Sequence, residues 1–182
     1  FRDHGLRQTR SRARLAFLIE ERGVAWFRRT LEQQLERPLP AAGRDARGAN
    51  GNDHVGVFRQ KQAGLNYVGL KTPVGRLTGA QLLELARLSE VYGRGELRFT
   101  PLQNVLLPHV PDRRLGELTA EPLLRELPYN PSEAQRGLVA CTGTDFCNLA
   151  LIDTKTRALA LARQLEQRVG RSRPISMRWS GC

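Results

Sequence analysis

The feature that most constrains this chain is a pair of short apolar runs that flank a segment with helical spacing. The runs cover residues 138–140 and 175–179, and the segment between them places apolar side chains at helical intervals. This pattern predicts a strand, a helix and a second strand. A connection of this kind forms a right-handed unit whose two strands run parallel. Both strands then end at the same edge of the sheet, where α/β folds place their ligands.

All three cysteines of the chain follow these two predicted strands. Cys141 and Cys147 come after the first strand and Cys182 after the second, so we expect the three side chains to converge. Burial as small apolar residues is one alternative. A disulfide is disfavoured by the odd number of cysteines, and a zinc site by the five residues between the first two. An iron–sulfur cluster would need a fourth thiolate. Gly143 and Gly181 favour turns that bend tightly around a ligand.

The cysteines lie in two motifs. The first reads Cys-Thr-Gly-x-x-Phe-Cys, Leu-Ile-Asp-Thr-Lys follows it, and the chain closes on Trp-Ser-Gly-Cys. Together they resemble the cluster-binding half of the sirohaem nitrite and sulfite reductases. The resemblance implies that Cys141, Cys147 and Cys182 bind a [4Fe–4S] cluster coupled to sirohaem, with a fourth cysteine beyond the chain end. It also implies that the whole chain is an internal fragment of a longer enzyme. Such a fragment is expected to be inactive alone and to contain no catalytic residue.

The spacing of the two motifs separates two branches of this family. Thirty-four residues lie between Cys147 and Cys182, which is more similar to the nitrite-reducing branch. That branch implies six-electron reduction of nitrite to ammonia in nitrate assimilation, with ferredoxin, an acidic protein, as the electron donor. It also implies a cytoplasmic enzyme, or one of the plastid stroma in a eukaryote. Ferredoxin-dependent reduction of sulfite is the alternative within the family.

Residues 57–130 have the pattern of a compact subdomain. Their order predicts strand, helix, strand, strand and helix, which is half of a ferredoxin-like unit. Thr78 and Gln81 form a capping box at the start of the first helix. Pro108 is expected to stop the third strand, and Asp112 to cap the last helix. The predicted strands cover Leu65–Leu70, Glu96–Thr100 and Asn104–Leu107, and the last helix runs through Leu123 and Leu127.

Two segments of this subdomain are similar to the second of two such units in the sirohaem reductases. They read Tyr-Val-Gly-Leu-Lys-Thr-Pro-Val-Gly-Arg-Leu and Gly-Glu-Leu-Arg-Phe-Thr-Pro-Leu-Gln-Asn-Val-Leu-Leu-Pro. The resemblance implies that Gln103 and Asn104 lie near the macrocycle, where their amides would bond a sirohaem carboxylate or a group beside the cluster. Thr142 is expected in the same neighbourhood. The alternative is that Gln103 and Asn104 are ordinary turn residues that satisfy their own backbone.

Residues 1–37 are expected to be helical, with a break at Gly23. The net charge of +11 comes almost entirely from arginine, and several arginines crowd into residues 7–14. A nucleic acid or an acidic electron-transfer protein would each suit this charge. A solvated helix face is favoured over nucleic acid because no stacking aromatics or recognisable module accompany the run. A basic nucleic-acid-binding module is therefore the alternative from another class. No apolar run approaches the roughly 20 residues that span a bilayer.

The expected fold class is mixed α/β, of the α+β type, in three parts. Residues 1–42 are expected to be the helical end of a first sirohaem-binding half. Residues 43–130 form the ferredoxin-like subdomain with its leading linker, because residues 38–56 are rich in proline, glycine, asparagine and aspartate. Residues 131–182 begin a sirohaem- and cluster-binding domain.

Overall fold

The computed structural model describes residues 1–43, 53–170 and 174–182. The chain divides into two compact units, Phe1–Ala49 and Asn50–Cys182. Much of the expected linker lies outside the described residues. The three-part division expected from the sequence stays a prediction.

The α-helices that the structure describes in the first unit lie between Leu15 and Leu35. Helices α1 (Leu15–Arg22) and α2 (Val24–Leu35) meet at Gly23, whose φ of 84° breaks the helical run as predicted. Before Leu15 the chain forms only a 3₁₀ turn, Arg10–Arg12, so the expectation of helix from residue 1 is wrong. Like charges at helical spacing destabilise a helix, and this basic segment has few apolar side chains to pack.

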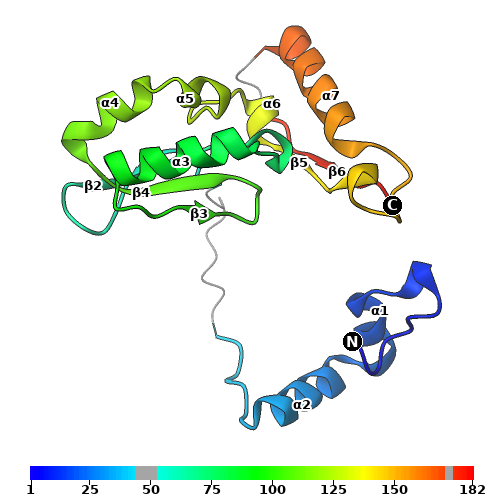
Figure 1. Ribbon diagram of the computed structural model, residues 1–182. Coiled ribbons are helices and arrows are strands. Elements are labelled where there is room, and N and C mark those ends of the chain that lie inside the picture. The colour runs from blue at the N-terminus through cyan, green and yellow to red at the C-terminus, as the bar shows by residue number, and fades with distance from the viewer. Residues whose placement is uncertain (44–52, 171–173) are drawn as a thin grey trace. The chain divides into compact units, whose positions relative to one another are not determined.

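The second unit is built on a four-stranded antiparallel sheet with strand order β1-β2-β4-β3. The strand predicted at residues 65–70 is confirmed, and β1 starts where the expected linker ends. The sheet carries helices on it, as Figure 1 shows, which confirms the expected α+β class. The four strands are β1 (Gly56–Arg59), β2 (Leu65–Leu70), β3 (Arg98–Phe99) and β4 (Val105–Pro111).

Pro108 does not stop its strand, contrary to the prediction, because β4 passes through it in a bulge. The register between β2 and β4 shifts between Asn66 and Val68. Next to the proline, His109 adopts a φ of 64°, and its N–H donates to Gln60 Oε1 at 2.6 Å instead of to the ladder. A bulge leaves ladder positions unpaired, so a residue without an N–H is tolerated there.

Helices α3, α4 and α5 complete the core on the sheet. Helix α3 (Gly79–Tyr92) starts in the predicted capping box: Gln81 N–H donates to Thr78 Oγ1 at 3.2 Å, and Thr78 N–H to Gln81 Oε1 at 2.9 Å. The expected last helix is two short ones, α4 (Leu115–Ala120) and α5 (Leu123–Glu126). The core holds Val68, Leu70, Leu85, Leu88, Leu107, Val110 and Leu118, among others.

Asp112 does not cap the last helix, which corrects a second prediction. It opens a 3₁₀ turn, Asp112–Arg114, that has no side-chain cap, and its carboxylate instead accepts a hydrogen bond from Asn66 Nδ2 at 2.6 Å. Asn66 is itself buried in β2 and needs acceptors for its amide. The satisfaction of a buried amide therefore takes precedence over a local cap.

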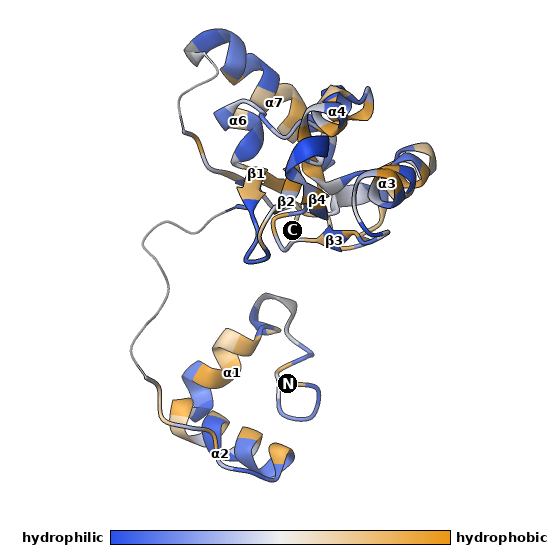
Figure 2. Ribbon diagram, turned by 90° about the vertical axis from the view of Figure 1, so that its left-hand side faces the viewer, coloured by the Kyte–Doolittle hydropathy of each residue, from blue (hydrophilic) through white to orange (hydrophobic). Residues whose placement is uncertain are grey.

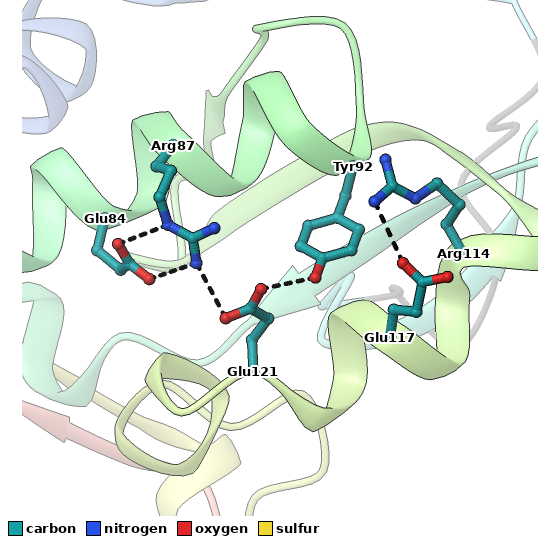
Figure 3. Close-up of polar contacts among 6 residues, drawn as sticks. All are labelled: Glu84, Arg87, Tyr92, Arg114, Glu117 and Glu121. Atoms are coloured by element: carbon teal, nitrogen blue, oxygen red, sulfur yellow. Dashed lines mark hydrogen bonds and ion pairs between the residues drawn. The ribbon is translucent and has the colours of Figure 1, made fainter.

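A polar network joins α3 to the turn between α4 and α5 (Figure 3). Glu121 lies at its centre: its carboxylate accepts from Tyr92 Oη at 2.6 Å and from Arg87 at 2.9 Å. Arg114 stacks on the ring of Tyr92, with 4.5 Å between the guanidinium carbon and the ring centroid. The hydrogen bond and the negative charge of Glu121 raise the pKa of Tyr92.

The rest of the second unit is a smaller layer beside the sheet. Strands β5 and β6 lie side by side and α7 packs on them (Figure 1), while Figure 2 shows blue, polar ribbon over the outer turns of α7. Its core contains Val74, Leu138, Ala140, Ala158 and Ala162, with Leu159, Met177 and Trp179 partly buried against it. The elements are α6 (Glu133–Arg136), β5 (Leu138–Ala140), α7 (Thr154–Val169) and β6 (Met177–Trp179). In the described parts of the chain, no helix has the length and apolarity needed to cross a membrane.

Candidate functional site

The predicted strand–helix–strand unit is confirmed. Strands β5 and β6 pair in parallel, with Ala140 opposite Trp179. The ladder continues one residue further, because Cys141 N–H donates to Trp179 O at 3.0 Å. Both strands therefore end at the same edge, and the turn that follows each of them carries cysteine (Figure 1).

Backbone hydrogen bonds tie the cysteine-bearing segments together. Gly181 O accepts from Leu151 N–H at 2.7 Å, which joins the tail that ends at Cys182 to the segment after Cys147. Gly181 N–H in turn points at Cys141, with 3.3 Å between its nitrogen and Cys141 Sγ. The segments after β5 and β6 thus lie against each other, as the parallel pairing predicts.

The three thiols are free, and Cys141 and Cys182 are exposed while Cys147 is half-buried. Within the described residues, no group of three histidine, cysteine, aspartate or glutamate side chains is arranged to hold a metal ion. The structure therefore brings the cysteine-bearing turns together, and the role of the three thiols as ligands stays a prediction.

Cys141 lies against the first turn of α7. Its thiol is 3.8 Å from Thr154 Oγ1, and the Thr154 hydroxyl donates to Cys141 O at 2.8 Å. Partial burial tends to raise the pKa of Cys141, but the N–H groups of Gly143 and Gly181, the Thr154 contact and the charge of Lys155 outweigh it and lower the pKa. A helix N-terminus also favours a thiolate. The surroundings of Cys141 therefore favour its thiolate form, which is the form of cysteine that binds metals.

Gly143 makes the close approach of this turn to α7 possible. It has a φ of 70°, and a Cβ built on it would lie 2.6 Å from Thr154 Oγ1 and 2.9 Å from Thr154 N. A larger residue would meet both a strained backbone conformation and the helix. Gly143 thus permits the tight bend that was expected, because the absence of a side chain lets the turn pack against α7.

Gln103 and Asn104 sit in the turn before β4, and the structure gives each a different environment. Gln103 is bonded to the end of β5: its Nε2 donates to Ala140 O at 2.7 Å and its Oε1 accepts from Ala140 N–H at 3.3 Å. Asn104 is buried, and its Oδ1 accepts from Thr72 N–H at 3.4 Å. Among the described residues, Asn104 Nδ2 and Thr72 Oγ1 are buried without a partner. Thr142 is exposed at the start of the cysteine turn.

Two buried lysines, which the sequence analysis did not single out, connect the four-stranded sheet with the layer formed by β5, β6 and α7. Lys71 Nζ donates to Leu138 O at 2.9 Å, and Lys155 Nζ donates to Val74 O. Burial lowers the pKa of both, that of Lys71 to about 8. One signal was available: Lys71 directly follows the strand predicted at Leu65–Leu70, and a lysine next to a buried strand needs a specific partner if it is buried as well.

Comparison with known proteins covers both layers. Residues 58–124 match the family described as the nitrite/sulfite reductase ferredoxin-like half domain. Over all of its residues the chain is 48% identical to a ferredoxin–nitrite reductase of Synechococcus elongatus, of which it covers 36%. It is 50% identical to the chloroplastic ferredoxin–nitrite reductase of Zea mays and covers 33% of that protein. An assimilatory ferredoxin-dependent nitrite reductase of Haloferax mediterranei is 42% identical, again with 33% covered.

A solved structure agrees with these relatives. The NirA protein of Mycobacterium tuberculosis matches all of this chain with a TM-score of 0.83 at 39% identity, and the match covers 34% of that protein. The chain thus spans about a third of the length of the relatives it matches. The predicted ferredoxin-like half unit and the resemblance that rests on the cysteine motifs are both confirmed. Over its whole length, the chain is a homologue of the ferredoxin–nitrite reductases, and at residues 58–124 it carries a nitrite/sulfite reductase ferredoxin-like half domain.

Proposed function

We propose that this chain is part of a ferredoxin-dependent nitrite reductase, which reduces nitrite to ammonia with six electrons in nitrate assimilation. The observation that carries the proposal is the match to named ferredoxin–nitrite reductases along all of its residues, at 42% to 50% identity. The activity belongs to the whole protein, and we assign no catalytic residue to this third of it.

The donor atoms of the cysteine turns have the chemistry that a [4Fe–4S] cluster requires. Cys141, Cys147 and Cys182 are free thiols on segments that backbone hydrogen bonds hold together, and Cys141 has a lowered pKa and an N–H group directed at its sulfur. Cubane clusters are bound by four thiolates, and hydrogen bonds to sulfur tune their potential. We assign these three cysteines as ligands, with the fourth thiolate supplied from outside the described residues.

The second proposed group is sirohaem. When bound, it would supply the iron at which the anion is reduced, because no side chain can supply the six electrons that the reaction needs. Asn104 is the residue of this chain best suited to help hold it, since its buried Nδ2 has no partner among the described residues and would gain one. Thr142 offers an exposed hydroxyl beside the cysteine turn. Both polar atoms of Gln103 are bonded to Ala140, so we assign it a different role below.

The proposed electron donor is reduced ferredoxin. Relatives from cyanobacteria and plants carry that donor in their names, and the plant relatives are named chloroplastic. The net charge of +11 suits an acidic partner. The cytoplasm or the plastid stroma is the proposed location.

Replacing one proposed ligand tests the cluster assignment. In the intact protein, Cys141→Ser should abolish the iron–sulfur absorption and lower the iron and sulfide content, because a serine hydroxyl does not replace a thiolate. Thr144→Ser is the matched control in the same turn and should leave both unchanged. Full iron and sulfide in Cys141→Ser would contradict the assignment.

The substrate is tested by turnover. The intact protein, supplied with reduced ferredoxin, should form ammonia from nitrite faster than sulfide from sulfite at equal anion concentration. Faster use of sulfite would overturn the proposed substrate and favour the sulfite-reducing branch. A preparation that lacks a visible chromophore and binds nucleic acid would overturn the proposal as a whole.

A further inference from the structure

Among the strands that the structure describes, β5 pairs with β6 alone, so one of its edges has no partner strand there. Its ladder to β6 uses Gly137 O, which accepts from Met177 N–H at 2.9 Å, and Cys141 N–H, which donates to Trp179 O at 3.0 Å. The Leu138 carbonyl and both the N–H and the carbonyl of Ala140 are bonded elsewhere. A free edge must have its N–H and C=O groups satisfied by something other than a strand.

Side chains of the half domain satisfy that edge. Lys71 Nζ donates to Leu138 O at 2.9 Å. The side-chain amide of Gln103 donates to Ala140 O at 2.7 Å and accepts from Ala140 N–H at 3.3 Å. An amide that donates and accepts on one residue imitates the pairing of a neighbouring strand. Two bonds to one residue fix both its position along the strand and its rotation about it. Ala140 directly precedes Cys141.

Gln103 is itself held tightly. Its backbone has a φ of 64°, which is uncommon for a residue other than glycine, and its N–H donates to Thr100 O at 3.0 Å. It packs against Gly75, where a Cβ would lie 2.8 Å from Gln103 Cβ. Strain of this kind persists only where the surroundings impose it, and it clusters at functional sites. Gln103 is therefore held by contacts of its own backbone as well as by its two hydrogen bonds to Ala140.

Cys141 depends on this register. Its sulfur accepts the Gly181 N–H at 3.3 Å, and an N–H···S bond lengthens quickly if the strand slides or rotates. We propose that Gln103 is a positioning residue: by clamping Ala140 it keeps Cys141 Sγ under the Gly181 N–H and so raises the reduction potential of the cluster assigned to Cys141. An N–H directed at sulfur stabilises the reduced cluster, which carries more negative charge. This inference rests on the proposed function, because it presumes the cluster.

The test is a redox titration of the intact protein, followed by electron paramagnetic resonance of the reduced cluster. Gln103→Leu removes both bonds to Ala140. We expect it to shift the redox equilibrium about tenfold toward the oxidised cluster, which is about 59 mV for a one-electron couple. Gln103→Glu keeps the acceptor for Ala140 N–H but replaces the donor with a carboxylate oxygen that repels Ala140 O, and its negative charge also disfavours the reduced cluster, so its shift should be in the same direction and no smaller.

Gln60→Leu is the matched control. Gln60 Oε1 also accepts a backbone N–H, that of His109 at 2.6 Å, but at the bulge of the sheet, away from the cysteine turns. It should lower stability as Gln103→Leu does, without moving the potential or the resonance signal. A potential unchanged in Gln103→Leu, or moved equally by Gln60→Leu, overturns the inference.

The remaining outcomes are also decisive. If both Gln103 variants keep their far-ultraviolet circular dichroism and lose the cluster, while Gln60→Leu retains it, the positioning role is supported. If both fail to fold, Gln103 is structural and the inference fails. Absence of iron and sulfide from the unsubstituted intact protein would instead refute the proposed function.

Discussion

At Lys71 a cationic side chain is buried between the sheet and β5, with 1% of its surface exposed. Its ammonium has the Leu138 carbonyl as acceptor, and burial lowers the pKa of Lys71 to about 8, although the negative charge of Asp53 opposes this. A buried ammonium whose partner among the described residues is one carbonyl, with no carboxylate in contact there, is destabilising while it stays charged. Lys71 lines a cavity whose other charged residues are Arg125, Glu126 and Arg163.

This burial predicts a pH dependence of stability. Between about pH 8 and pH 10.5 the unfolded state binds more protons at Lys71 than the folded state, so the contribution of Lys71 to the free energy of unfolding rises with pH. The rise is at most about 3.5 kcal/mol, because the two pKa values differ by about 2.5 units and each unit corresponds to about 1.4 kcal/mol. Denaturant unfolding across this range should show the free energy of unfolding of the unsubstituted protein rising with pH relative to that of Lys71→Met. Lys61→Met, at an exposed lysine, is the control. A pH-independent difference for Lys71→Met would contradict the burial of its charge.

At the scale of elements, α3 is attached to the rest of the half domain by apolar packing and by the network around Glu121 (Figure 3). α3 supplies Tyr92 and Arg87, which reach one carboxylate in the turn between α4 and α5. Tyr92 is 8% exposed, so its hydroxyl lies at the border of the core. A hydrogen bond to a charged group contributes more than a neutral one.

Tyr92→Phe should therefore lower the free energy of unfolding by about 1–2 kcal/mol, because the ring still packs and only the bond to Glu121 is lost. Denaturant unfolding at neutral pH measures it. Glu84→Gln is the control: it disturbs an exposed pair with Arg87 inside the same helix, and pairs of this kind contribute about 0.3–0.5 kcal/mol. Equal losses in both variants would show that the contact between α3 and the α4–α5 turn has no special importance.

At the scale of the whole molecule, the net charge of +11 is the property most relevant to a partner protein. Attraction between opposite charges accelerates association, and salt screens it over roughly 8–10 Å at physiological ionic strength. The arginines of residues 7–14 add to this charge, and those the structure describes include Arg7, Arg12 and Arg14. The net charge suits an acidic electron donor, but it does not identify the surface on which that donor would dock.

The rate constant for reduction by ferredoxin, the proposed donor, should accordingly fall roughly tenfold or more as salt is raised from about 0.01 M to 0.5 M. Stopped-flow absorbance of the intact protein measures it. Reduced methyl viologen, a small cation, is the control, and its rate should not fall with salt. A ferredoxin rate independent of salt would show that the basic charge plays no part in docking.

Much of this chain follows from local patterns. The helix break at Gly23, the capping box at Thr78 and the strand at residues 65–70 each depend on a few neighbouring residues. The parallel pairing of β5 with β6, and so the approach of Cys182 to the turn after β5, follows from the handedness of strand–helix–strand connections. These features could be predicted because periodicity, caps and chirality act over short stretches of chain.

Tertiary structure alone decided the contacts between distant residues. Pro108 continues its strand because a bulge interrupts the ladder there, with the next N–H, that of His109, bonded to Gln60. Asp112 bonds the buried Asn66 instead of capping a helix. At the candidate site, the sequence determined which turns carry cysteine, whereas the attachment of Ala140 to Gln103 appeared only in three dimensions. The reason is physical: a buried polar group must find a partner, and which partner is within reach depends on how the elements pack, not on the residues beside it in the chain.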